Sequence, residues 1–168
     1  MTESKYIWMD GEFTPWNEAK VHVLSHTLHY GNGAIEGTKA YKTVDGRCAI
    51  FKLNEHTQRL LNSSKMTLMN VPFSLEELNK AQVELLQKNE LTNGAYIRPL
   101  VYLGYGVMGL YHKDAPVKVS ISAWEWGAYL GEDGINKGIR VKTSSFTRHF
   151  VNSSLVRAKA SGYYINSI

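Results

Sequence analysis

Two consecutive helical segments with strand-like segments on both sides constrain this fold most. Leucines recur at helical spacing over residues 53–67, which predicts an amphipathic helix with Arg59 near its middle. Ser74 and Glu77 have the spacing of a capping box, which predicts a second helix that continues to about Asn89. Strands that enclose a helical pair are typical of an α+β domain.

The flanking segments carry strand and turn signals. Asp10-Gly11 and Asp45-Gly46 each separate two short runs, and Asp-Gly is favoured in hairpin turns where both residues need positive φ. Ser25 precedes a segment that ends at Tyr30-Gly31 and is a candidate cap for a short helix. The segments predicted as strands are 6–9, 12–14, 38–42, 48–51, 95–103 and 117–124.

The chain is expected to contain one small domain and the opening of another. Residues 127–138 include four glycines and show no core periodicity, so they are typical of a linker. We therefore expect a small α+β domain over residues 1–126 and the beginning of a larger domain over residues 139–168, with a strand at 139–144. About thirty residues cannot close a second core.

Charge and cysteine content exclude several classes of protein. The 19 Lys and Arg residues and 15 Asp and Glu residues leave a net charge of +4, and they alternate along the chain, so we expect no nucleic-acid partner and no membrane partner. The single cysteine, Cys48, cannot form an internal disulfide, which favours a cytoplasmic location. His26 and His29 lie three residues apart without a third ligand, so we expect structural histidines and no metal site.

Six short motifs occur in a fixed order along the chain. They are residues 21–26 (VHVLSH), 29–31 (HYG) with 36–37 (EG), 55–60 (EHTQRL), 95–99 (AYIRP), 126–130 (WGAYL) and 157–164 (RAKASGYY). In this order and spacing, the sequence resembles the branched-chain amino-acid aminotransferases, which are fold-type IV (D-amino-acid-aminotransferase-like) pyridoxal-phosphate enzymes. The resemblance runs from about Tyr6 to Ile168.

The resemblance implies three residues that bind pyridoxal 5'-phosphate. Lys159 matches the Schiff-base lysine, whose amine bonds to the cofactor aldehyde and later moves the substrate Cα proton. Arg59 matches the arginine that binds the cofactor phosphate, where a planar bidentate donor suits a dianion. Tyr164 matches the tyrosine that hydrogen-bonds the phenolic oxygen of the cofactor.

The resemblance also implies a substrate site and an oligomer. Tyr96 and Arg98 are two residues apart on a predicted strand and share a face, and in the family this pair faces the substrate, with the arginine near the distal carboxylate of glutamate or 2-oxoglutarate. At least a homodimer is implied, in which Tyr30 and Met108 reach the site of the neighbouring subunit. The walls of the substrate site would be Tyr30, Ile35, Gly37, Met108, Trp126 and Tyr129.

Two positions depart from the usual family pattern near this site. Ile35 stands where the family usually has phenylalanine, which reshapes the substrate pocket and leaves the preferred side chain open. Lys39 stands where the family usually has arginine.

The resulting hypothesis is transamination of leucine, isoleucine and valine with 2-oxoglutarate, as in branched-chain amino-acid biosynthesis. One alternative is a related fold-type IV enzyme: a D-amino-acid transaminase, an amine transaminase or aminodeoxychorismate lyase. The other alternative is an inactive fragment. In the family, a carboxylate at the pyridine nitrogen and backbone amides at the phosphate come from the second domain, beyond the position of Ile168.

Overall fold

The computed structural model describes residues 2–127, 134, 136–150 and 152–168. Within these residues, seven strands form one antiparallel sheet in the order β2-β1-β7-β6-β4-β5, and β3 pairs with β6 beside β4. The strands are β1 Tyr6–Met9, β2 Glu12–Pro15, β3 Gly33–Ile35, β4 Thr38–Lys42, β5 Cys48–Ile50, β6 Ala95–Leu103 and β7 Val117–Trp124. The helices are η1 Trp16–Glu18, α1 His26–Tyr30, α2 Leu53–Met66, α3 Leu75–Lys88 and η2 Ser161–Ser167.

Local sequence signals account for the turns and for the start of α3. Asp10 and Gly11 both have positive φ between β1 and β2, which confirms the predicted hairpin. The capping box of α3 is present in both directions, because Glu77 N donates to Ser74 Oγ over 3.2 Å and Ser74 N donates to a Glu77 carboxylate oxygen over 2.7 Å. Ser25 does precede α1, but its hydroxyl makes no capping hydrogen bond.

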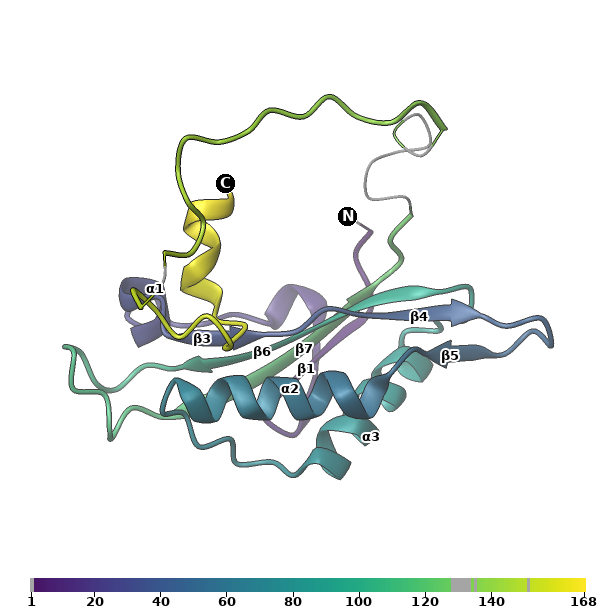
Figure 1. Cartoon of the computed structure of the whole chain (residues 1–168). Coiled ribbons are helices and arrows are strands. Elements are labelled where there is room, and N and C mark those ends of the chain that lie inside the picture. The colour runs from purple at the N-terminus through teal and green to yellow at the C-terminus, as the bar shows by residue number, and fades with distance from the viewer. Residues whose placement is uncertain (1, 128–133, 135, 151) are drawn as a thin grey trace.

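The two long helices cover one face of the sheet and leave the other face for a site. On β6, the odd-numbered Ile97 and Val101 are fully buried on the face that packs against α2, and α3 packs against the neighbouring β7 and β1. The even-numbered Tyr96 and Arg98 point to the opposite face, because side chains alternate along a strand. Figure 1 shows α2 and α3 under the sheet and the C-terminal segment above it. No helix formed by the described residues is long and apolar enough to cross a membrane.

The segment around Lys159 lies along the edge strand β3. Ala160 forms an antiparallel bridge with Ala34, and Ile35 N donates to the Lys159 carbonyl over 3.0 Å. The Lys159 amide in turn donates to Ser63 Oγ of α2 over 3.0 Å. Lys159 is therefore fixed by backbone contacts to both the sheet and a helix.

The predicted strand at 139–144 is wrong. These residues form no strand in the described structure, where Ile139 is 54% and Val141 85% exposed. A strand needs a neighbour for its backbone hydrogen bonds, and the described residues provide none here. The predicted linker lies largely outside the described residues, so the division into domains stays a prediction.

Candidate active site

A buried carboxylate joins the sheet to α2 next to the site. Glu36 lies between β3 and β4, is 1% exposed, and accepts hydrogen bonds from Arg59 Nε and from Arg59 Nη2 at 2.9 Å. His56 Nδ1 lies 2.9 Å from the same carboxylate, and the Gly37 amide donates to it over 3.2 Å. Burial raises the pKa of Glu36, but the hydrogen bonds from Arg59 and His56 outweigh it and bring the pKa below its ordinary value. Glu36 thereby orients Arg59.

Lys159 and Tyr164 form the second contact of the site. Lys159 Nζ donates to the Tyr164 hydroxyl over 2.5 Å, and the Arg148 guanidinium lies 5.1 Å from the centre of the Tyr164 ring. The hydrogen bond from Lys159 is the largest cause of a lowered Tyr164 pKa, and the charges of Lys159 and Arg148 act in the same direction. The Tyr164 hydroxyl is thus more acidic than that of a free tyrosine. Sequence reasoning missed Arg148, because no motif marks a residue whose role depends on this contact.

Tyr96 and Arg98 lie together on the open face of the sheet, as predicted. Arg98 Nη2 donates to the Tyr96 hydroxyl over 2.8 Å, whereas the buried Arg98 Nε has no hydrogen-bond partner in the structure. The Tyr96 ring packs edge-on against Trp126, with centroids 4.5 Å apart. A half-buried guanidinium with an unused donor is suited to bind an anion.

Two cavities meet at Lys159 and Tyr164. The larger cavity, of ≈ 610 Å³, lies on the sheet side and is also lined by Ile35, Lys39, Tyr96, Arg98, Trp126, Gly127, Ser161 and Ile168. The second, which we call the arginine cavity, has a volume of ≈ 280 Å³ and is also lined by Arg59, Arg148, His149, Val156, Arg157, Ala158, Ala160 and Tyr163. No described Asp or Glu side chain lines either cavity, so both favour anionic groups.

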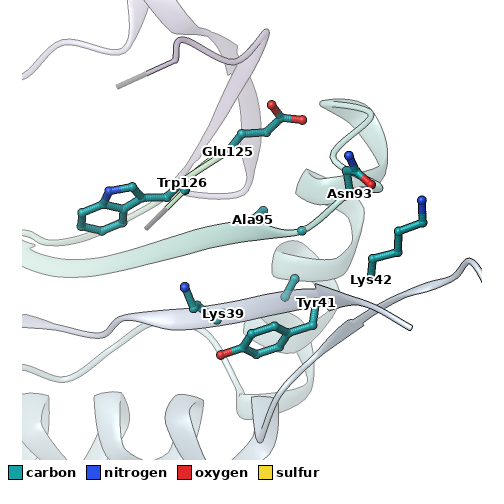
Figure 2. Close-up of a pocket in the computed structure, with 10 residues that line it drawn as sticks. Lys39, Tyr41, Lys42, Asn93, Ala95, Glu125 and Trp126 are labelled. Carbon is teal, nitrogen blue, oxygen red and sulfur yellow. The ribbon is translucent and has the colours of Figure 1, made fainter. Parts of the chain in front are cut away.

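A third cavity, of ≈ 350 Å³, adjoins the larger one. Lys39 and Trp126 line both, and Figure 2 shows these two residues at one end, with Lys42 and Asn93 at the other. Lys39 is directly opposite Tyr96 in the β4–β6 pairing. The sequence marked Lys39 only as a departure from a family pattern, and its place beside Tyr96 follows from strand register.

The predicted substrate walls are only partly brought together. Ile35 and Trp126 line the larger cavity. Tyr30 and Met108 do not line it, and they stand on the surface with 43% and 46% exposure. Tyr129 lies outside the described residues.

Gly37 is required by the position of Tyr96. A Cβ atom at residue 37 would lie 2.0 Å from the Tyr96 hydroxyl oxygen and 2.8 Å from its ring carbon Cζ. Because φ of Gly37 is not positive, the constraint is steric and comes from the approach of Tyr96. The fold thus places residue 37 against the substrate-facing pair that the sequence predicted.

We expect Gly37→Ala to displace Tyr96 and to break its hydrogen bond with Arg98. Overpacking of this kind costs about 1 to 3 kcal/mol. Activity of the full chain should fall, and the double variant Gly37→Ala, Tyr96→Phe should recover part of the loss, because it removes the clashing oxygen. Unchanged activity in Gly37→Ala would show that residue 37 tolerates a Cβ atom beside Tyr96.

Residues 33–167 match the family model described as amino-transferase class IV. The chain belongs to this family. It is 51% identical over 162 residues to the branched-chain-amino-acid aminotransferase of Pseudomonas aeruginosa, covering 96% of this chain and 52% of that relative. The relative of the same name from Escherichia coli K12 is 42% identical over 175 residues, covering 100% of this chain and 55% of the relative. The chain spans about half the length of these relatives.

Solved structures of class IV aminotransferases confirm the predicted fold. The branched-chain amino acid aminotransferase of Escherichia coli superposes with a TM-score of 0.91 at 41% identity, covering 98% of this chain and 54% of that one. The T.th. enzyme of the same name, solved with pyridoxamine 5'-phosphate, superposes with a TM-score of 0.90 at 44% identity, covering 99% and 54%. The α+β arrangement described above is therefore the N-terminal portion of the fold-type IV architecture.

Proposed function

We propose that the protein is a pyridoxal-phosphate-dependent aminotransferase of branched-chain L-amino acids, with 2-oxoglutarate as amino acceptor. The relatives at 42% to 51% identity carry this enzyme name. The T.th. enzyme has also been solved with N-(5'-phosphopyridoxyl)-L-glutamate. The observation that carries the proposal is the position of Lys159, where two cation-lined cavities meet.

The residues around Lys159 fit the proposed cofactor. When bound, pyridoxal phosphate supplies an aldehyde for attachment and an electron sink for chemistry at Cα. Arg59 would bind the phosphate from the arginine cavity, and Tyr164, with its lowered pKa, would hold the phenolic oxygen. The Lys159 amine would anchor the group and move the Cα proton, since it reaches both cavities.

The larger cavity fits both proposed substrates. Ile35 and Trp126 offer apolar and aromatic surface for an aliphatic side chain. Arg98 lines this cavity, and its guanidinium offers a charge-assisted hydrogen bond to the distal carboxylate of glutamate or 2-oxoglutarate. One cavity can then bind the two substrates in turn.

Arg98→Ala should lower turnover with glutamate and 2-oxoglutarate far more than with leucine, which has no distal carboxylate. The loss of a charge-assisted contact corresponds to about 1.5 to 3 kcal/mol, or roughly 10- to 100-fold in kcat/KM. Steady-state kinetics of the full chain with each substrate measure the difference. Equal losses on all substrates would leave Arg98 a structural role only.

A comparison of substrates tests the proposed activity against its alternatives. Initial rates of the full chain with L-leucine, D-alanine, a chiral amine and aminodeoxychorismate should be highest with L-leucine. Activity with one of the others and none with L-leucine would refute the proposal. Intact mass in solution, compared with the 19.0 kDa of this sequence, distinguishes an inactive fragment from a longer active protein.

We also propose that the protein is at least a homodimer and is cytoplasmic. The segments at residues 21–30, which include α1, and 105–111 present exposed apolar side chains. The Tyr30 hydroxyl accepts a hydrogen bond from Gly109 N over 3.1 Å, which joins the two segments. If a second copy covers this surface, Tyr30 and Met108 of one subunit would lie beside the candidate active site of the other subunit. The single cysteine supports the reducing location.

A further inference from the structure

We infer that Arg157 is a second cation for the cofactor phosphate, beside Arg59. The inference rests on the proposed function, because the phosphate comes with pyridoxal phosphate. Arg157 lines the arginine cavity together with Arg59, Lys159 and Tyr164.

Arg59 alone does not supply the charge that a phosphate requires. Its Nε and Nη2 atoms already donate to the buried Glu36 carboxylate, so the pair has no net charge. A phosphate monoester at neutral pH carries about −1.5 to −2 charges. Arg59 retains free N–H groups for hydrogen bonding, but its positive charge is balanced by Glu36.

The other cations of the cavity are engaged near Tyr164. Lys159 Nζ donates to the Tyr164 hydroxyl, and Arg148 stacks on the Tyr164 ring while its Nε donates to Ser167 Oγ over 2.6 Å. These contacts hold both cations at the phenol side of the cavity. Among the described residues, Arg157 forms no salt bridge with a carboxylate, so its charge is not balanced in that part of the chain.

The backbone fixes the position of Arg157. Ala158 and Ala160 are each 4% exposed, and the Ala158 amide donates to the Leu155 carbonyl over 2.8 Å in the preceding turn. Arg157 is itself exposed, at the rim of the cavity. A guanidinium in such a place can contact a phosphate through two parallel N–H groups.

The test compares pyridoxal phosphate with pyridoxal, which has the same ring and aldehyde but no phosphate. Dissociation constants of both are measured by absorbance titration of the cofactor-free full chain. Arg157→Ala should weaken binding of pyridoxal phosphate about tenfold and leave pyridoxal binding unchanged. Arg157→Lys should lie between wild type and Arg157→Ala, because it keeps the charge and loses the bidentate geometry.

Arg140→Ala is the matched control, because Arg140 is an exposed arginine of the same segment and does not line the arginine cavity. It should bind both compounds as the wild type does. Equal effects of Arg157→Ala on both compounds, or no effect, would overturn the inference. If Arg157→Ala does not fold, Arg157→Gln provides the same comparison. A wild-type protein that binds neither compound would instead contradict the proposed function.

Discussion

Lys159→Ala should abolish covalent attachment of pyridoxal phosphate and nearly all aminotransferase activity. Lys159 lines both cavities, and its amine hydrogen-bonds Tyr164. Its loss therefore removes the group that would attach the cofactor and the base that would move the Cα proton. Loss of proton transfer alone lowers the rate by about 10²- to 10⁴-fold. Borohydride treatment of the full chain, followed by peptide mass spectrometry, should locate the reduced adduct on Lys159 in the wild type and find none in the variant.

Lys39→Ala is the matched control for this experiment. Lys39 is a second lysine that lines the larger cavity, and it lies opposite Tyr96 on β4. This variant should keep the adduct on Lys159. An adduct on Lys39, or on any other lysine of the wild type, would show that the assignment of Lys159 is wrong.

Glu36→Gln should destabilise the full chain at neutral pH by about 2 kcal/mol. A buried hydrogen bond to a charged group contributes about 1.5 to 3 kcal/mol, and the half-exposed Arg59 partner places this pair in the lower part of that range. The side-chain amide of glutamine at position 36 would also place an N–H donor where Arg59 now finds only acceptor oxygens. Urea unfolding at pH 7 measures the loss, and Glu55→Gln, an exposed glutamate of α2 paired with Lys52, should cause none that is measurable.

The effect of Glu36→Gln should shrink at low pH. The pKa of Glu36 is lowered in the folded state, so its contribution is complete above the ordinary carboxyl pKa of about 4.3. That contribution disappears as the pH falls from this value through the lower pKa of the folded protein. Unfolding at about pH 3 should therefore bring wild type and variant closer together. A constant difference between pH 7 and pH 3 would show that packing, and not charge, causes the loss.

The secondary structure could largely be predicted because its signals are local. Asp10-Gly11 fixes a hairpin through two positive φ angles, and Ser74 with Glu77 begins α3 through two hydrogen bonds within one turn. The strand predicted at 139–144 failed because a strand signal in the local sequence shows only that a segment is able to pair. Whether it pairs depends on a neighbour that the local sequence does not contain.

The sequence motifs identified the main residues of the candidate site, but they did not identify the side chains that hydrogen-bond or stack on those residues. Lys159, Tyr164, Arg59 and the pair Tyr96 and Arg98 were all predicted as site residues, and their roles remain proposals. The contacts of Glu36 were not predicted, although its motif was recognised, because a carboxylate between two strands gives no sign of facing α2. The same holds for Arg148, whose contact with Tyr164 joins residues 16 positions apart.

The sequence by itself determined six of the seven strands, the two long helices, the Asp10-Gly11 turn, the start of α3 and the identity of the candidate lysine and arginines, but it did not indicate β3. These depend on backbone preferences within a few residues and on short motifs. Only the tertiary structure decided that Lys159 lies beside β3 and α2, that Glu36 neutralises Arg59, and that Gly37 makes room for Tyr96. Such contacts join distant parts of the chain, and their geometry is set by strand register and helix packing, which act on the whole domain at once.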